Sequence, residues 1–367
     1  MKQSKIKIIP ILWVFCAALF CGSCGQEENL KQASTGNPRI KWRLASSYPH
    51  SLDTIFGAAK VLSARVESLS GGQFTIRVYP AGELVPGLEV MDAVQQGTVP
   101  IGHTASYYYI GKHPALVFDT SVPFGLTARE QTAWMYKGGG IEALKPIFAQ
   151  FGILALPGGN TGAQMGGWFR KEIHSMQDIV GLKMRIPGLG GKIMDRLGAN
   201  VQVLSGGDIY PALDRGAIDA TEWVGPHDDV KLGFHQVAKN YYYPGWWEPG
   251  PQLSFMINQV AWDKLPAKYQ SILEVACKEA HLQMLVDYDT KNPKALKELK
   301  STEINIAAFP TDFLKQAEVE TKKFLAEQSA QNSDFKKVLE SWIRFKESSN
   351  EWQKLSEYHY RKYLFDE

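Results

Sequence analysis

The chain has 367 residues, of which 44% are hydrophobic and 21% are charged, and its formal net charge is +2. A nearly neutral chain without a basic patch or a recognised binding motif gives no reason to expect a nucleic-acid partner. About 330 residues remain after the amino-terminal segment described below, which is more than one hydrophobic core usually serves, so we expect two domains.

Residues 1–24 have the pattern of an export signal. Lys2, Lys5 and Lys7 precede an apolar run from Ile8 to Cys21 that is short for a membrane span, and small residues follow it. Gly22-Ser23-Cys24 resembles a bacterial lipobox, although Cys21 stands where a leucine is usual. We therefore predict an exported, periplasmic protein with a lipid anchor at Cys24 and a polar tether over residues 25–38.

Loss of the signal segment changes the charge and the cysteine inventory. Its three lysines are not balanced by acids, so the remaining chain has a net charge of −1. Cys16 and Cys21 leave with the segment, and Cys24 is the predicted lipid site. Cys277 alone remains, so we expect no intrachain disulfide and interpret Cys277 as a small buried hydrophobe in a helix.

The first predicted domain alternates strands and helices, which is typical of an α/β sheet. Period-two and helical spacing predict strands at 41–47, 74–80, 99–104 and 153–156, and helices at 54–68, 87–96, 128–136 and 141–151. The glycine-rich turn at 158–162 suggests a first crossing between domains, which places domain I at 39–160.

The second predicted domain, 161–254, has the same alternation. We expect strands at 164–169, 182–186, 200–204 and 217–223, and helices at 191–197, 208–215 and 226–234. Strands at 241–244 and 252–258 are expected to return to domain I, of which 255–310 is the second part and includes a strand at 303–308. Long amphipathic helices complete the chain over 311–367.

Arg185 ends the predicted strand Leu182–Ile186, just before a Pro-Gly break. Ligands in open α/β sheets bind at the carboxyl ends of strands, and a guanidinium there can grip a carboxylate with two hydrogen bonds. The alternative is a surface arginine that is paired with a nearby acid.

Three further clusters carry residues of ligand type. Asn160 and Gln164 lie in a glycine-rich turn, Glu222 and Trp223 end a predicted strand, and Glu248 lies between tryptophans and prolines. If Arg185, Glu222 and Glu248 share one pocket, an anionic ligand raises the negative charge there to −2, which a bound cation would relieve. Carboxylate, amide and carbonyl oxygens suit sodium or calcium and do not suit zinc. A structural ion pair with Arg185 is the alternative for Glu248.

Other patterns are weaker. His227, Asp228 and Asp229 could bind a metal, but acids at the start of a helix also favour its dipole. Gly188–Gly191 lacks dinucleotide-binding spacing, and no nucleophile motif or paired metal-binding histidines occur. Tyr107, Tyr108 and Tyr109 could line an apolar pocket or could lie in the core.

Four segments together resemble the solute-binding proteins of TRAP (tripartite ATP-independent periplasmic) transporters. The general family mark is Gly181-Leu182-Lys183-Met184-Arg185. The segments Gly159–Trp168, Thr221-Glu222-Trp223 and Gly245–Pro251 are similar to the subgroup that binds 2-oxo or 2-hydroxy monocarboxylates, such as pyruvate or lactate, with a cation. The resemblance extends from about Ile40 to the final helices.

The resemblance implies a two-domain, hinged α/β fold of the periplasmic-binding-protein (Venus flytrap) type with long C-terminal helices. It implies that Arg185 grips the substrate carboxylate and that Na⁺ or Ca²⁺ is held by Gln164, Glu222, the Trp223 carbonyl and Glu248. It also implies substrate contacts at Asn160, Tyr108, Gln164, Trp223 and Glu248. The partners are then TRAP membrane subunits, with a possible homodimer through exchanged C-terminal helices.

The expected function is therefore cation-assisted binding of a small monocarboxylate without covalent chemistry. An exported metal-dependent enzyme that acts on oxo acids and a sensory ligand-binding protein are the alternatives. An enzyme would need a general base near the pocket, for which His227 is the obvious local histidine.

Overall fold

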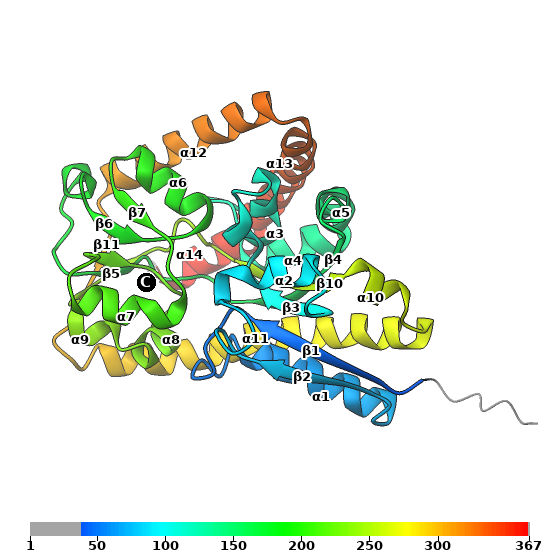
Figure 1. The fold of residues 1–367 in the computed structure, drawn as a ribbon. Helices are drawn as coiled ribbons and strands as arrows, with labels where there is room; N and C mark the ends of the chain where they lie inside the picture. The colour runs from blue at the N-terminus through cyan, green and yellow to red at the C-terminus, as the bar shows by residue number, and fades with distance from the viewer. Residues whose placement is uncertain (1–37, 366–367) are drawn as a thin grey trace, which may run out of the picture. The chain divides into compact units, whose positions relative to one another are not determined.

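Two mixed β-sheets organise residues 38–365, the part of the chain that the computed structural model describes (Figure 1). The predicted signal and lipobox segment (1–24), residues 25–37 of the tether and residues 366–367 lie outside the described residues. The α/β class with long C-terminal helices is confirmed. Within the described residues, no helix has both the length and the apolar character needed to cross a membrane.

The first sheet has the strand order β2-β1-β3-β10-β4. Its strands are β1 (Ile40–Ser46), β2 (Phe74–Tyr79), β3 (Ile101–Thr104), β4 (Ile153–Asn160) and β10 (Gln252–Asn258). Strand β1 runs parallel to β2 and β3, whereas β10 runs antiparallel to β3 and β4. Strand β10 comes from a distant part of the sequence, lies between β3 and β4, and is buried in all but its last residue.

Short and long helices pack around the first sheet, and together they form what we call the first lobe. They are α1 (Gly57–Ser70), η1 (Gly87–Glu89), α2 (Val90–Gln95), η2 (Ser106–Tyr109), η3 (Pro114–Leu116), α3 (Val117–Thr120), α4 (Ala128–Lys137), α5 (Gly140–Ala149) and α10 (Gln259–Asp263). Local signals set several ends: Gly71 stops α1 in the left-handed region, and Thr127 with Glu130 forms a capping box on α4.

The second sheet has the order β11-β9-β5-β8-β6-β7, and with its helices it forms the second lobe. Its strands are β5 (Gly167–Phe169), β6 (Lys183–Arg185), β7 (Asn200–Gln202), β8 (Ala220–Thr221), β9 (Asn240–Tyr243) and β11 (Asn305–Ala308). Its helices are η4 (Met176–Ile179), α6 (Gly188–Arg196), α7 (Gly206–Asp214), α8 (Pro226–Lys231) and α9 (Phe234–Val237).

Two strands lie in a different sheet from the one expected. We predicted that the strand at 241–244 returns to the first domain, but β9 pairs with β5 and β11 in the second sheet, so this prediction is wrong. The strand expected at 303–308, within the first-domain segment 255–310, forms β11 in the second sheet as well. Strand periodicity does not encode a pairing partner, and Tyr241 and Tyr242 are buried there against Trp168 and Phe309.

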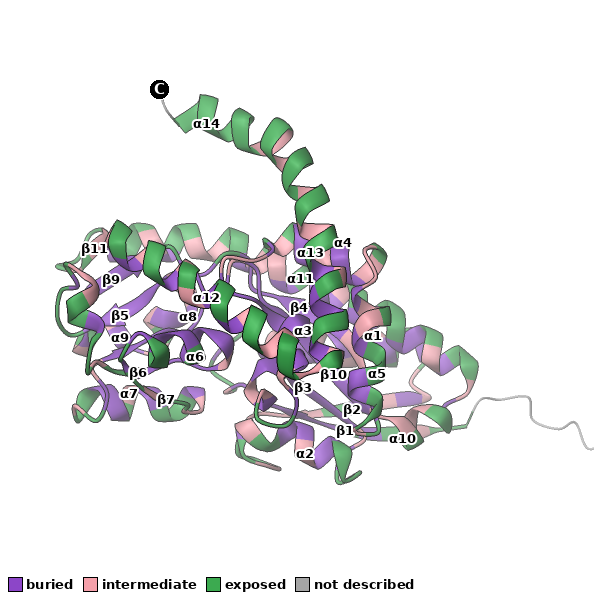
Figure 2. Cartoon of the chain, turned by 90° about the horizontal axis from the view of Figure 1, so that it is seen from above, coloured by how far each residue is buried: buried purple, intermediate pink, exposed green. Residues whose placement is uncertain are grey.

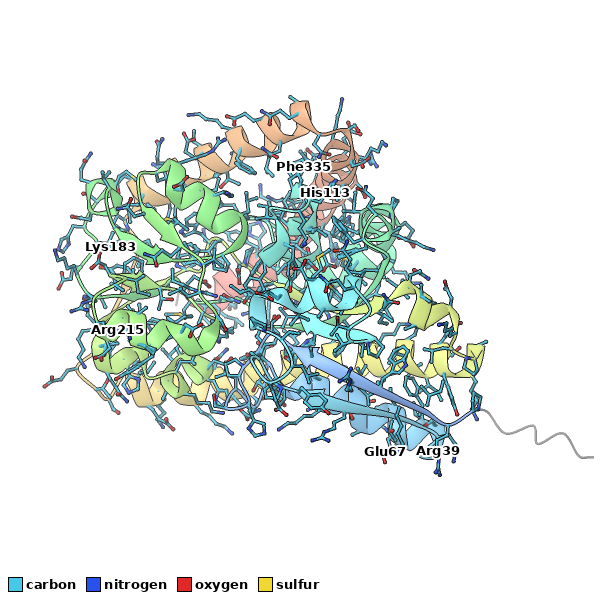
Figure 3. All side chains as sticks on the ribbon, in the orientation of Figure 1. Arg39, Glu67, His113, Lys183, Arg215 and Phe335 are labelled. Atoms are coloured by element: carbon cyan, nitrogen blue, oxygen red, sulfur yellow. The ribbon has the colours of Figure 1, made fainter. Side chains whose placement is uncertain are left out.

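Long helices connect the two lobes. Helix α11 (Ala267–Leu299) packs against α1 and β4 of the first lobe and against α8 of the second (Figure 1). Helix α12 (Thr311–Gln331) packs on α6, and Asn332 then caps α13 (Ser333–Gln353), which returns to the first lobe. There α13 packs on η3, near the region where Figure 3 labels Phe335 and His113.

The chain then continues through η5 (Lys354–Tyr358) into α14 (His359–Phe365). Figure 2 shows this end as an exposed helix that extends away from both sheets. Its large apolar side chains are exposed, and Leu355 and Phe365 are each 74% accessible.

A buried carboxylate, Asp119 of α3, joins three elements of the first lobe. Its side chain accepts hydrogen bonds from Ser106 of η2, from Ser254 of β10 at 2.7 Å and from Gln252 of β10 at 3.2 Å. Because η2 also carries Tyr107, Tyr108 and Tyr109, this network fixes the position of the three tyrosines.

We expect Asp119 to make stability depend on pH. Burial raises its pKa from 3.8 to about 6, although the hydrogen bonds oppose that rise. The folded state then keeps the proton to higher pH than the unfolded state, so the stability from this carboxyl is lost as pH rises from about 4 through about 6. The loss is on the order of 3 kcal/mol.

Urea unfolding of the wild type and of Asp119→Asn between pH 4 and 7 measures this effect. The asparagine does not titrate, so the stability advantage of the wild type over the variant should shrink with rising pH. A constant difference across this range would contradict the assignment.

Candidate functional site

A cavity between the lobes is lined by most of the residues that the sequence singled out. Tyr108, Gln164, Arg185, Trp223 and Glu248 share its lining, with additional residues that include Tyr48, Ile55, Tyr107 and Thr161. Each lies where a strand ends or where the chain crosses between sheets: after β1, β3, β6 and β8, and in the β4–β5 and β9–β10 connections. This is the position at which open α/β sheets bind ligands.

Arg185 is 1% exposed at the end of β6, whereas Lys183 at the start of the same strand is exposed on the outer side of the second lobe (Figure 3). The Arg185 side chain donates to the Leu204 carbonyl at 3.1 Å, to the Glu222 carbonyl at 3.1 Å and to the Glu222 carboxylate. Its guanidinium carbon lies 5.2 Å from the Trp223 ring centroid. Within the described chain Nη2 has no hydrogen-bond partner.

The alternative for Arg185 was an ion pair with a nearby acid at the surface. Arg185 does form an ion pair, but its partner is Glu222 and both side chains are buried. Burial raises the pKa of Glu222 to about 7, Arg185 opposes the rise, and Asp229 adds to it. Since Arg185 still has a free donor, the ion pair and an anion-binding role are compatible.

Glu248 is 4% exposed and lies in the β9–β10 connection. Burial raises its pKa well above the usual value and the Glu222 charge adds to this, whereas Tyr107, Arg185 and Gln164 oppose it. Its Oε2 atom has no hydrogen-bond partner among residues 38–365. Two buried carboxyl groups thus face a single arginine, so ionising both would leave a negative charge that is costly in a desolvated site.

The β4–β5 and β9–β10 connections, which are the two crossing segments, are hydrogen-bonded to each other. This contact places Gln164 beside Glu248. The Gly245 amide donates to the Gln164 carbonyl at 3.0 Å, and a Cβ on Gly245 would come within 2.6 Å of that oxygen. The Gln164 side-chain amide donates to Thr161 at 3.1 Å, which leaves its Oε1 without a partner in the described structure. An amide oxygen and a carboxylate oxygen are therefore both available to a hard cation.

Asn160 lies differently from what we expected of a substrate contact. Its side chain donates to the Gly250 carbonyl at 3.1 Å and accepts from the Gly162 amide at 2.9 Å. Because both ends of the amide are occupied by backbone groups, we interpret Asn160 as a positioning residue that joins the two crossing segments. Neither Asn160 nor Glu222 is among the residues that line the cavity.

The acids at the start of α8 lie in its first turn, as expected, and they also have partners outside the helix. Asp228 and Asp229 are buried, and they accept hydrogen bonds from Tyr288 at 2.6 Å and from Tyr241 at 2.7 Å respectively. They connect α8 to α11 and β9 and are more than solvated charges at a helix start. Sequence patterns did not indicate these contacts, because the partners belong to other elements of the fold.

His227 lies with Asp53 and Asp228 in a group of possible metal ligands. Lys231 and Lys291 also contact Asp53, and with His227 they lower its pKa even though partial burial opposes the shift. Two ammonium groups on this carboxylate disfavour a metal ion there. His227 is also not among the residues that line the cavity, so it does not provide the general base that an enzyme would need.

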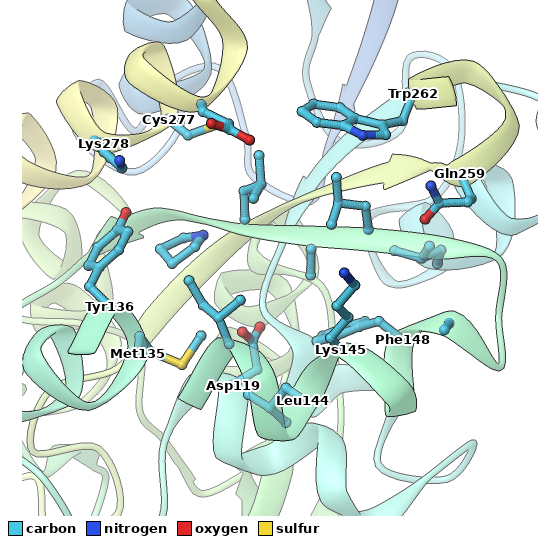
Figure 4. A pocket seen from close by; sticks show the side chains of 18 residues that line it. Asp119, Met135, Tyr136, Leu144, Lys145, Phe148, Gln259, Trp262, Cys277 and Lys278 are labelled. Atoms are coloured by element: carbon cyan, nitrogen blue, oxygen red, sulfur yellow. The ribbon is translucent and has the colours of Figure 1, made fainter. Parts of the chain in front are cut away.

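A larger cavity of ≈ 390 Å³ lies elsewhere in the first lobe, between β4, α5 and α11 (Figure 4). Its lining is mainly apolar and includes Met135, Leu144, Phe148 and Trp262. It contains neither Arg185 nor Glu248, whereas the smaller cavity contains both, so the chemistry that the sequence predicted belongs to the smaller cavity.

Comparison with known proteins identifies the family of the chain. Residues 45–332 match the family described as bacterial extracellular solute-binding protein, family 7. A monocarboxylate 2-oxoacid-binding periplasmic protein of Nostoc sp. is 51% identical over 341 residues, which cover 93% of each chain.

Solved structures show the same similarity. One is a TRAP transporter solute-binding protein from Bordetella bronchiseptica, which is described as a mixed-occupancy dimer with copurified calcium and picolinate in one site. It is 44% identical with a TM-score of 0.89, and the match covers 90% of this chain and 98% of that one. A TRAP periplasmic solute-binding protein from Pseudoalteromonas atlantica with bound sodium and pyruvate is 42% identical with a TM-score of 0.86, over 88% and 99% of the two chains.

The family model covers most of the chain, and the Nostoc relative matches nearly all of it at high identity. Both are solute-binding proteins and neither is an enzyme. The chain belongs to family 7 of the bacterial extracellular solute-binding proteins.

Proposed function

We propose that the protein binds a small 2-oxo or 2-hydroxy monocarboxylate, such as pyruvate or lactate, together with Na⁺ or Ca²⁺, and delivers it to TRAP membrane subunits. One observation carries this proposal: the buried cavity combines acceptors on Gln164 and Glu248 with a guanidinium donor on Arg185, none of which has a hydrogen-bond partner among the described residues. The acceptors suit a cation and the donor suits an anion. Relatives that are described with pyruvate, a 2-oxoacid, sodium or calcium support the same pairing.

Each residue then has a distinct role. Arg185 holds the ligand carboxylate through Nη2, while its other nitrogens stay bonded to Leu204 and Glu222. Gln164, Glu222, Glu248 and the Trp223 carbonyl hold the cation, which supplies the positive charge that the two buried carboxylates lack. Tyr108 and Trp223 line the cavity and keep water from the ion pair.

Entry of the ligand requires movement. The cavity volume is only ≈ 10 Å³, which leaves room for about one water molecule. We infer that the lobes open at the crossing segments 161–166 and 244–251 and close on the loaded site. The domain division at residues 160/161 and 254/255 remains part of this proposal, with β11 assigned to the second lobe.

The amino-terminal segment implies where the protein acts. As part of this proposal, the mature chain is periplasmic and held to the membrane by a lipid on Cys24. An intact-mass measurement of the mature amino-terminal peptide would detect that lipid.

We also propose a homodimer through the exposed C-terminal helices. Trp352, Leu355, Tyr358, Tyr363 and Phe365 are each more than half exposed in the described monomer, which is unusual for so many large apolar side chains on one short segment. The Bordetella bronchiseptica relative is described as a dimer.

The first prediction concerns Arg185. Arg185→Ala should lower the affinity for pyruvate by about 100-fold or more, because a desolvated charge contact is lost. The variant also leaves Glu222 unpaired, so Arg185→Lys, which keeps the charge without the planar fork, is the matched control and should bind with intermediate affinity. Tryptophan fluorescence or calorimetry with sodium pyruvate measures both, alongside thermal melts. Full affinity in a folded Arg185→Ala protein, or consumption of pyruvate by the wild type, would refute the proposal.

The second prediction concerns the cation. Glu248→Gln removes one negative charge from the ion site, so a higher Na⁺ or Ca²⁺ concentration should be needed for the same pyruvate affinity. The measurement is a pyruvate titration at several cation concentrations. The exposed Glu172→Gln serves as the control and should behave like the wild type. An unchanged cation dependence in Glu248→Gln would remove Glu248 from the ion site.

The third prediction concerns the oligomer. A chain that ends at Gln353 lacks η5 and α14, and we expect it to be monomeric by light scattering under conditions in which the full mature chain is dimeric. Its pyruvate affinity should change little, because no cavity residue lies beyond Leu253. A truncated chain that remains a dimer would place the interface elsewhere.

A further inference from the structure

Tyr48 lines the cavity, although no sequence motif indicated a role for it. It follows β1 in the first lobe, is 1% exposed and contributes to the same lining as Arg185 and Glu248. Its hydroxyl oxygen is fully buried and has no hydrogen-bond partner among the described residues. A buried hydroxyl without a partner costs free energy, so its retention at a binding cavity points to a ligand contact.

The neighbouring tyrosines differ from Tyr48 in this respect. Tyr107 interacts with Glu248, and Tyr108 interacts with Arg185. The Tyr109 hydroxyl accepts from the Met91 amide at 3.0 Å and lies 3.1 Å from the Thr104 hydroxyl. Of these four tyrosines of the first lobe, Tyr48 is the one whose hydroxyl is fully buried without a hydrogen-bond partner among the described residues.

Packing holds the Tyr48 ring in place. The His103 ring centroid lies 5.4 Å away and the Trp223 ring centroid 6.5 Å away, both in edge-to-face geometry. The ring therefore bridges the first lobe and the residue after β8 in the second lobe. Burial raises the pKa of the hydroxyl well above its usual value, and nearby Tyr108, Tyr109 and Glu248 add to this. The hydroxyl thus keeps its proton and acts as a donor.

Four polar atoms of the cavity-lining residues have no hydrogen-bond partner within the described structure, and each of them can contact a cation or a ligand. Gln164 Oε1 and Glu248 Oε2 are acceptors, and Arg185 Nη2 and the Tyr48 hydroxyl are donors. A cation takes the acceptors, and the ligand carboxylate takes the Arg185 donor from the second lobe. The remaining donor comes from the first lobe and needs a second oxygen on the ligand.

We propose that the Tyr48 hydroxyl donates a hydrogen bond to the 2-oxygen of the bound acid and thereby selects 2-oxo and 2-hydroxy acids over acids without that oxygen. This inference rests on the proposed function and adds the residue that determines substrate class. An acid without the 2-oxygen leaves the buried hydroxyl unpaired, and sites built around such a contact discriminate strongly against analogues that lack it. The contact also ties the ligand to both lobes.

The test compares Tyr48→Phe with the wild type in titrations of pyruvate, lactate and propionate, with propionate affinity taken from competition against pyruvate. Phenylalanine keeps the ring packing and removes only the hydroxyl. Affinity for pyruvate and lactate should fall about tenfold, whereas propionate affinity should be unchanged or higher, so the pyruvate-to-propionate ratio falls about tenfold.

Tyr109→Phe is the matched control, because it removes a buried hydroxyl of the same lobe that already has protein partners. It should lower thermal stability and leave the ratio unchanged. An unchanged ratio in Tyr48→Phe, or an equal loss for all three acids, overturns the proposal.

A crystal structure of the wild type with pyruvate provides an independent measurement. The Tyr48 oxygen should lie within about 3 Å of the 2-oxygen, and a separation beyond hydrogen-bond distance also overturns the proposal. A wild type that binds none of the three acids would refute the proposed function itself, whereas wild-type binding with an unaffected Tyr48→Phe refutes this inference alone.

Discussion

The buried ion pair between Arg185 and Glu222 is the constraint on which the site depends. Neither side chain has access to water, so the pair needs further contacts to offset its desolvation. The backbone carbonyls of Leu204 and Glu222 accept hydrogen bonds from two guanidinium nitrogens, and the third, Nη2, has no partner among the described residues. Glu248 then adds a second buried carboxylate without a second arginine. In the proposed function a cation balances the two carboxylates and an anion takes the remaining guanidinium donor, which is why the two are expected to bind together.

The fold places these groups by bringing distant segments together. The connections β4–β5 and β9–β10 cross between the sheets side by side and are hydrogen-bonded through Gly245 and Gln164, and Asn160 joins them again at Gly250. On the first lobe, the Asp119 network holds η2 and therefore the tyrosines that face the arginine. Substitutions that disturb these supports would alter binding without touching the ligand.

Much of the architecture was predictable because local patterns are strong. Strand alternation and helical spacing located β1, β2, β10 and most helices, since burial of one face imposes those periods directly. Pairing was harder. The strands β9 and β11 were recognised as strands but assigned to the wrong lobe, because alternation carries no information about the neighbouring strand. The position of Asn160 in a motif predicted a substrate contact, whereas in the structure its side chain is hydrogen-bonded to the backbone of the two crossing segments.

The sequence by itself determined which residue types are available: an arginine at a strand end, two glutamates in unusual apolar surroundings, an amide in a glycine turn, and a resemblance that joins them. Only the tertiary structure decided how these residues meet. It paired Arg185 with Glu222 and not with Glu248, buried Asp228 and Asp229 as hydrogen-bond acceptors, and left the Tyr48 hydroxyl unpartnered within the described residues. The physical reason is that a hydrogen-bond partner and the loss of water around a charge are properties of three-dimensional packing, which residue order alone does not specify.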